Sequence, residues 1–427
     1  MSSFIPREIQ EIIREIRDQS DPSFSVLSEE EQSISPSFME DIMLIPVERH
    51  DFLAPIEVGP CATKIVYEAF LDGVQRTVMW CRIRLPTGAL VPIHIAHIAA
   101  GAVLRDRSGR LFIDPDLIAA RLLLLGPFRG LEEAGIKSLP FSDITWDTDT
   151  KTFGFPATPN EWIVCDTTFC GTDKKREERR KGALLGNELF KEGLIRSRAQ
   201  GRVATLRQRL EFAVLARFRA KYPEKWVLFD GPLFFIDKWR RRATKVLGAE
   251  LGEQRESPFE AALLAKTVGL IKTHRLRPKR PDQVLKIGPN ERSSVVRTSK
   301  EVDMKGSRGT PDEEGSYAGA HLTWYTRLRG RNTPPYGLLG LVRIDVHRAT
   351  FGIESADELS PENFDEYRPL VDAITQGIWM ERWPAFRRVE DYRSATQVYP
   401  IEQLEKVLKA RVYPRRFLAS IWAAEVP

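Results

Sequence analysis

The chain has few cysteines and no pattern that would use them. Its 427 residues include four, Cys61, Cys81, Cys165 and Cys170, and no two of them form a C-x-x-C pair. No spacing of cysteine and histidine matches a structural zinc site. We therefore expect reduced thiols that lie mostly in the core, as in a protein of a reducing compartment.

Long apolar runs are also missing. The longest stretch without a charge, Ala89 to Leu104, is shorter and more polar than a membrane-spanning helix requires. The chain begins Met1-Ser2-Ser3 and continues into a charged segment, whereas a signal peptide has an apolar centre. These absences predict a cytoplasmic protein with no membrane partner.

The sequence also lacks the G-x-x-x-x-G-K-[ST] loop that binds nucleotide phosphates, so any DNA motor must be another protein. The net charge is only +5, which permits a nucleic-acid partner without requiring one. His94 and His97 lie three residues apart in an apolar stretch, and we expect packed histidines there rather than a pair of metal ligands.

The most informative features present are two apolar runs that end in Asp-Gly. Trp226 to Phe234 reads W-V-L-F-D-G-P-L-F, and Ala69 to Gly73 reads A-F-L-D-G. Each run predicts a buried strand with an aspartate, Asp230 or Asp72, at its end. Two such carboxylates side by side repel each other unless a cation lies between them, and Mg²⁺ and Mn²⁺ prefer carboxylate oxygens.

A third acid, Glu211, lies on a predicted helix from Arg202 to Lys221. The apolar stripe of this helix comprises Val203, Leu206, Leu210, Val214 and Phe218. Glu211 falls at the edge of the stripe, where it can face a cleft between the helix and a sheet. The alternative is that Glu211 only forms an ion pair with Arg207, four residues earlier on the same side.

The remaining patterns predict a mixed α/β protein. We expect strands at Lys64 to Leu71, Val78 to Leu85, Leu90 to Ile95, Trp162 to Thr168, His321 to Arg329 and Tyr336 to His347, with another ending at Lys272. Helices are expected at Pro6 to Arg17, Asp116 to Leu125 and Ile401 to Ala410, and a basic helix start at Trp239 to Arg242. Gln19 to Phe38 has the composition of a linker, and Lys286 to Gly315 that of a loop.

The order of these pieces resembles the NurA nuclease family, whose members are partners of the HerA helicase-translocase. The matching pieces are Asp72-Gly73, Glu211, Asp230-Gly231-Pro232-Leu233, the strand ending in Lys272, Tyr325 to Leu328, Arg343 to Val346, and Tyr399-Pro400. The resemblance covers patches between Ala62 and Ala410. The chain departs from the family in three places. Val74 replaces a serine, the gap between Asp72 and Glu211 is long, and the last helix has no histidine. Lys406 and Lys409 are the candidate substitutes for that histidine.

This resemblance implies an RNase H-like mixed β-sheet flanked by helices. Residues 1–50 would form an amino-terminal amphipathic helix and linker, and residues 51–427 a NurA-like nuclease domain. The long gap implies an inserted subdomain at about 105–201.

The resemblance also implies the site. Asp72, Glu211 and Asp230 would bind Mn²⁺ or Mg²⁺, Lys272 would contact phosphate, and Tyr399 would position the substrate or the attacking water. DNA is expected to contact the basic residues after the strands, which are Lys272, His274, Arg275, Arg277, Arg240 and Arg241.

The implied assembly is a homodimer on a hexameric HerA-like ATPase. The apolar face of Ile5, Ile9, Ile12 and Ile16 is the candidate contact, unless that helix covers the protein's own core. Three functions remain open: a DNA nuclease that processes ends, a NurA-like scaffold that has lost turnover, and a nuclease of an anti-phage system.

Overall fold

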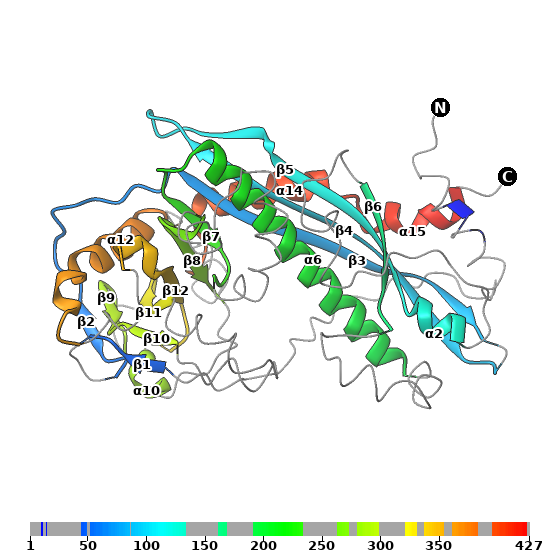
Figure 1. Ribbon diagram of the computed structural model, residues 1–427, viewed down its shortest axis with the longest axis horizontal. Coiled ribbons are helices and arrows are strands. Elements are labelled where there is room, and N and C mark those ends of the chain that lie inside the picture. Colours follow the sequence, from blue (N-terminus) through cyan, green and yellow to red (C-terminus); the bar gives the residue numbers. More distant parts are fainter. Residues whose placement is uncertain are drawn as a thin grey trace.

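The structure is a computed structural model that describes residues 10, 11, 14, 44–48, 52–85, 87–133, 161–168, 191–233, 263–272, 280–298, 321–330, 337–353, 361–382 and 395–424. In these ranges the chain is a mixed α/β protein with one twelve-stranded mixed sheet flanked by helices (Figure 1). The predicted α/β class is confirmed.

Three long strands dominate the sheet. They are β3 (Ala69–Arg84), β4 (Leu90–Arg105) and β5 (Leu111–Gly126), and they form an antiparallel meander. β6 (Glu161–Asp166) extends it in parallel beyond β5. The strands expected at Leu90 to Ile95 and Trp162 to Thr168 are confirmed as parts of β4 and β6.

The other half of the sheet begins at β3. β7 (Val227–Asp230) runs parallel to β3, and β8 (Thr267–Ile271) runs parallel to β7. β12 (Leu341–His347) and β11 (His321–Arg327) follow as antiparallel neighbours. Short strands complete this edge: β1 (Leu44–Pro46), β2 (Pro55–Glu57), β9 (Glu291–Ser293) and β10 (Val296–Thr298). Strands β9 and β10 lie where the sequence predicted only a loop.

Helices cover the sheet. The longest, α6 (Glu192–Lys221), crosses the three long strands in Figure 1. The others are α2 (Phe128–Glu133), α10 (Pro281–Val284), α12 (Arg368–Met380), α14 (Tyr399–Arg411) and α15 (Arg415–Ala424), with 3₁₀ turns η1 (Arg348–Phe351) and η3 (Phe364–Glu366). None of the helices in the described ranges is long and apolar enough to cross a membrane.

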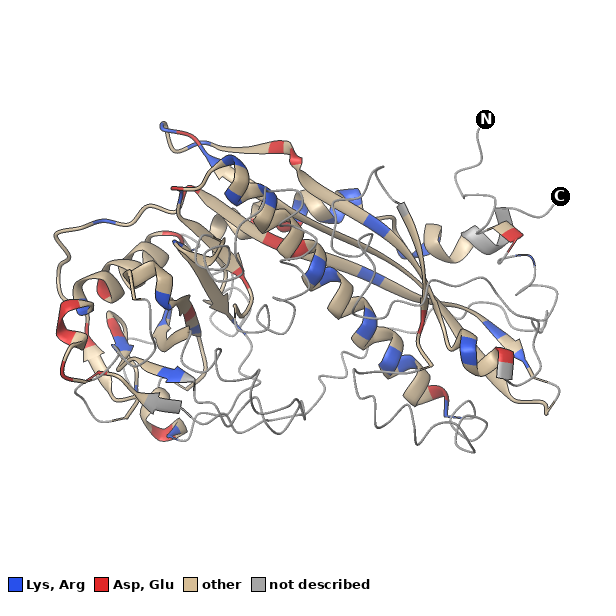
Figure 2. Ribbon diagram, viewed as in Figure 1, with Lys and Arg blue, Asp and Glu red and all other residues tan. Residues whose placement is uncertain are grey.

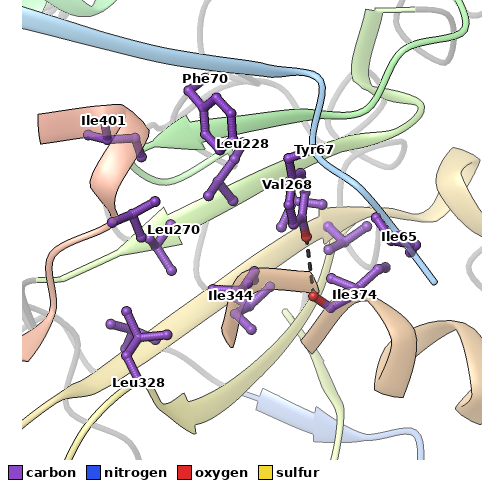
Figure 3. Close-up of a cluster of buried hydrophobic side chains, with 14 of the residues drawn as sticks. Ile65, Tyr67, Phe70, Leu228, Val268, Leu270, Leu328, Ile344, Ile374 and Ile401 are labelled. Atoms are coloured by element: carbon purple, nitrogen blue, oxygen red, sulfur yellow. Dashed lines mark hydrogen bonds between the residues drawn. The ribbon is translucent and has the colours of Figure 1, made fainter. Parts of the chain in front are cut away.

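The two faces of β3 belong to different cores, because successive side chains of a strand point to opposite sides. Leu71 packs with Leu206 and Leu210 of α6. Phe70 belongs to the second core, with α14, α12 and the β8, β11 and β12 strands (Figure 3). The predicted stripe of α6 is buried as expected, although the helix starts ten residues before Arg202.

The predicted strand end at Asp72 is wrong. Strand β3 begins at Ala69 and continues to Arg84, so the expected strands at Lys64 to Leu71 and Val78 to Leu85 are replaced by one. Asp72 pairs with Gly101 and Gly73 pairs with Ala100 inside the β3–β4 ladder. An Asp-Gly pair suggested a turn, but this glycine serves a close approach by another side chain, described below.

The predicted helix at Asp116 to Leu125 is also wrong, because this segment lies in β5. Its leucine-rich run favours a helix by propensity, but a short continuous apolar run also suits a strand buried on both faces. β5 pairs with β4 on one side and β6 on the other. Tertiary pairing therefore overrides the local preference.

Segment 105–201, expected to be an insertion, contributes β5, β6 and the start of α6 to this architecture. The division into residues 1–50 and 51–427 stays a prediction. Most of the expected amino-terminal helix, including Ile5, Ile9, Ile12 and Ile16, lies outside the described residues, as does the linker.

Candidate metal-binding site

Two of the predicted acids lie on adjacent parallel strands. The β3–β7 register pairs Phe70 with Leu228 and Leu71 with Phe229, and its next step brings Asp72 beside Asp230. Neighbouring strands are about 4.8 Å apart. Phe70 and Leu228 share one core, so Asp72 and Asp230, two residues further along each strand, lie on that same face. The prediction that β7 ends in Asp230 is confirmed.

Glu211 approaches these acids from the opposite face of the sheet, where α6 packs. A Cβ on Gly73 would lie 2.8 Å from Glu211 Cγ and 2.9 Å from its Cδ, closer than side-chain carbons approach each other. The missing side chain of Gly73 therefore makes the room for Glu211. β7 ends at Asp230, level with Asp72 and one residue short of the position of Gly73. Glu211 therefore contacts β3 just beyond the end of the neighbouring strand.

The electrostatics of the acids report their closeness. Burial raises the pKa of the Asp72 carboxyl well above its ordinary value, and the nearby Asp230 and Glu211 carboxylates raise it further against the opposing effect of Lys272 and Arg207. Burial raises the pKa of Glu211 to about 7, with Arg207 opposing the rise and Asp230 adding to it. The three acids therefore form one electrostatic cluster.

Two basic side chains neutralise part of this cluster. Lys272 Nζ lies 2.7 Å from Asp230 Oδ2, and Arg207 Nη1 lies 2.8 Å from Glu211 Oε1. Arg207 Nη1 also donates to the Gly73 carbonyl at 2.9 Å. Asp72 Oδ1 accepts the Gly73 backbone N–H at 2.7 Å. The ion pair between Arg207 and Glu211 that the sequence suggested does form, and the Glu211 carboxylate also interacts electrostatically with Asp72 and Asp230.

The cluster fits a divalent cation by the chemistry of its carboxylate ligands, and not by a preformed arrangement of those ligands. In the described ranges, no three His, Cys, Asp or Glu side chains are arranged so that they could hold a metal ion. The donor types suit Mg²⁺ and Mn²⁺. Burial is the main cause of the raised pKa values, and a cation would offset the repulsion among the carboxylates that adds to it. Arg207 and Lys272 supply counter-charge to Glu211 and Asp230.

Lys272 directly follows β8, as predicted from the strand ending there. Val268 and Leu270 of β8 belong to the core that Phe70 joins, so Lys272 lies on the same face as Asp72 and Asp230. Its ammonium, with a side chain 17% exposed, borders the buried acids and the surface.

Tyr399 opens α14, and its backbone N–H donates to the Glu381 carbonyl at 2.9 Å. The residue is 41% exposed. Ile401, one half-turn later, packs in the core beside Phe70, Leu228 and Leu270, as Figure 3 shows. The first turn of α14 thus rests on the strands that carry the acids, while the role of the Tyr399 hydroxyl stays a prediction.

The lysines considered as substitutes for the missing histidine bind elsewhere. Lys406 pairs with Glu402 at 3.1 Å and Lys409 with Glu405 at 2.8 Å, both within α14. Both lysine side chains are about half exposed on the helix surface. These contacts are ordinary i,i+4 helix pairs.

Five of the predicted DNA contacts, His274, Arg275, Arg277, Arg240 and Arg241, lie outside the described residues. His94 and His97 are buried on β4, and His97 Nδ1 accepts the Tyr413 backbone N–H at 2.9 Å. Burial lowers the pKa of His94 to about 4. The expectation of packed histidines is confirmed.

The sequence pattern indicated Arg207 only as an ion-pair partner of Glu211, as the alternative to a metal-binding role for that acid. The structure makes it part of the acid cluster, because the Glu211, Asp72 and Asp230 carboxylates all raise its pKa. The usable signal was the spacing itself, since a basic residue one turn before a cleft-facing acid shares its side of the helix.

Compared with models of known protein families and with curated proteins, the chain matches none.

Proposed function

We propose that this chain is a divalent-metal-dependent DNA nuclease with an RNase H-like core of the NurA type. One observation carries the proposal: three acids far apart in the sequence converge from β3, α6 and β7 into one electrostatic cluster. Two basic side chains border it. Asp72, Glu211 and Asp230 are the residues that would hold Mn²⁺ or Mg²⁺.

The chemistry follows from the charges. A bound divalent cation would lower the pKa of an attacking water and stabilise charge on the phosphate oxygens during phosphodiester hydrolysis. Asp72 and Asp230, fixed side by side on strands, keep the acidic oxygens in place. Lys272 holds a positive charge where the phosphate arrives. Tyr399 is proposed to orient the substrate or the water.

DNA as the substrate is supported by the charge of α6. The helix carries eight basic residues and two acidic ones, and Figure 2 shows Lys and Arg recurring along its length. Arg196, Arg198 and Arg202 are partly exposed, and Arg217 is exposed. Arg209 and Arg219 are buried, so the four accessible arginines are the ones that suit a phosphate backbone. A HerA-like hexameric ATPase and a second copy of the chain are the proposed partners.

The decisive experiment is a cleavage assay on linear duplex and single-stranded DNA with Mn²⁺, Mg²⁺ or EDTA. We expect cleavage with a divalent ion and none with EDTA. Asp72→Asn and Asp230→Asn should each reduce the rate by at least about 100-fold while the fold is retained, because each removes a charged ligand. Unchanged activity in either variant would refute the site assignment.

One observation favours the alternative of a non-catalytic scaffold. Helix α14 has no histidine, and its two candidate replacements, Lys406 and Lys409, are bound to glutamates of their own helix. DNA or ATPase binding without cleavage under any metal condition would support this reading. Roles in end processing and in anti-phage defence share the same chemistry, and the neighbouring genes distinguish them.

A further inference from the structure

The two basic side chains at the acid cluster form ion pairs with carboxylate oxygens that a divalent cation would need as ligands. Lys272 Nζ contacts Asp230 Oδ2, and Arg207 Nη1 contacts Glu211 Oε1. A cation bound to these carboxylates would repel both basic groups and compete with them for the same oxygens. The resident cations and a metal ion are therefore alternatives for at least part of the site.

The charge balance favours such an exchange. When all groups are ionised, three carboxylates accompany two basic side chains, so one negative charge is left over at a site where Asp72 and Glu211 are buried and Asp230 is partly exposed. Adding a divalent cation while Arg207 and Lys272 stay nearby would change the net charge of the cluster from −1 to +1. An anion such as a phosphate would then restore the balance.

Arg207 has the donors to bind that phosphate. Its Nη1 donates to both the Gly73 carbonyl and Glu211, whereas its buried Nε has no hydrogen-bond partner among the residues that the structure describes. A guanidinium presents donors in a fixed fork that matches phosphate oxygens. The Arg207 and Lys272 side chains are 25% and 17% exposed, so both side chains are partly accessible from solvent.

We infer that Arg207 and Lys272 are exchangeable counter-ions: a divalent cation displaces them from Glu211 and Asp230, and the released groups bind a backbone phosphate of the nucleic acid. This inference rests on the proposed function and adds Arg207 as a phosphate-binding residue. It makes metal and DNA cooperative ligands, because each binds better once the other is present. By linkage, the two must strengthen each other by the same factor.

The first test measures Mn²⁺ binding directly, without DNA, by titration calorimetry. Lys272→Gln and Arg207→Gln remove a competitor of the metal, so each should tighten Mn²⁺ binding by about two- to fivefold, the value of one partly exposed ion pair. If the basic residues instead hold the acids in place for the metal, both variants will bind Mn²⁺ more weakly, and the exchange is refuted.

The second test measures the affinity for a cleavage-resistant phosphorothioate oligonucleotide in EDTA and in Mn²⁺. Wild type should bind about tenfold more tightly with Mn²⁺, within the usual range of coupling between two ligands. Each glutamine variant should lose most of that gain. Lys266→Gln, which breaks an exposed ion pair with Glu224, is the matched control and should keep it.

Folding is checked for each variant, and Arg207→Lys retains the charge if the glutamine is not tolerated. Lys272, beyond the end of β8, tests the exchange independently of Arg207. If the wild-type chain binds no Mn²⁺, both the proposed function and this inference are refuted. A wild-type chain that binds Mn²⁺ and cleaves DNA, but whose variants keep the full Mn²⁺-dependent gain, overturns the exchange alone.

Discussion

At the scale of single residues, Gly73 determines whether the acid cluster can form. Glu211 occupies the space in which any other residue would carry its Cβ. Gly73→Ala should push Glu211 away from Asp72 and lower the free energy of unfolding by about 1–3 kcal/mol, as overpacking of a buried site does. Urea denaturation measures the stability, and Mn²⁺ titration measures the loss of the site.

Gly201 provides the matched control on α6. A Cβ at Gly201 would have no atom within 4 Å, and the residue is solvent-exposed and lies away from both ends of the helix. Gly201→Ala should therefore raise the stability by up to about 1 kcal/mol through helix propensity. If both alanine variants had the same effect, Gly73 would not be the point of close approach.

Glu211 should also make the stability of the metal-free chain depend on pH. Its pKa is about 7 in the folded protein against an ordinary 4.5, so the folded state retains the proton longer than the unfolded state. The contribution of Glu211 to stability therefore falls as the pH rises from about 4.5 to 7 and is constant above that. Glu211→Gln removes this loss.

Between pH 4.5 and pH 8, the free energy of unfolding of Glu211→Gln should rise relative to that of wild type by on the order of 3 kcal/mol, as the pKa difference requires. Urea denaturation in EDTA at several pH values provides the measurement. A stability difference between the two proteins that is independent of pH would contradict the proposed burial of this carboxyl.

At the scale of elements, a buried ion network joins the short-strand edge of the sheet to helix α12. Arg292 of β9 is fully buried and contacts Glu48, just after β1, at 2.7 Å and Asp372 of α12 at 2.6 Å. Arg368 reaches the same Glu48 at 3.1 Å. Removing one partner of such a pair leaves an uncompensated charge in the core.

Arg292→Met should accordingly lower the free energy of unfolding by about 3–5 kcal/mol. Arg368→Met, whose side chain is 35% exposed, should cost less, because water reaches the group it leaves. Adding Glu48→Gln to Arg292→Met should recover part of the loss, since it removes the stranded charge. A double variant less stable than Arg292→Met would show that the network stabilises by packing rather than by charge.

The elements also show how far the sequence could predict the fold. Periodicity identified α6, α14, β7, β8, β11 and β12, because each has a one-sided or continuous apolar pattern bounded by recognisable ends. It failed at β5, where leucine-rich composition is ambiguous, and at β3, where Asp72-Gly73 read as a turn. Both errors have one cause: the deciding contacts come from residues distant in the chain.

The same limit applies to the site. Asp72, Glu211, Asp230 and Lys272 were predicted from strand ends and a helix edge, and the structure brings them together. The link between Arg207 and the Gly73 carbonyl could not be predicted, because it joins α6 to a backbone atom 134 residues away in sequence. Sequence patterns find side chains with characteristic chemistry, but backbone partners carry no such signature.

At the scale of the whole molecule, the proposed nuclease function requires a partner that delivers DNA to the acid cluster, since the sequence has no G-x-x-x-x-G-K-[ST] nucleotide-binding loop. The proposed partner is a HerA-like ATPase, contacted through the amino-terminal segment. That segment spaces Ile5, Ile9, Ile12 and Ile16 as one face of a helix, the pattern of helix-in-groove docking. The alternative is that these isoleucines cover the chain's own core.

Deleting residues 1–18 separates the two possibilities. If the isoleucines bind the ATPase, the truncated chain should remain soluble, unfold with the same midpoint as wild type and fail to co-purify with a co-expressed HerA-like protein. If they belong to the core, it should aggregate or lose several kcal/mol of stability, since each buried isoleucine is worth about 1.5–3 kcal/mol. A single Ile9→Asp substitution in the full chain repeats the test without shortening the protein. Retained co-purification by both variants would place the ATPase contact elsewhere.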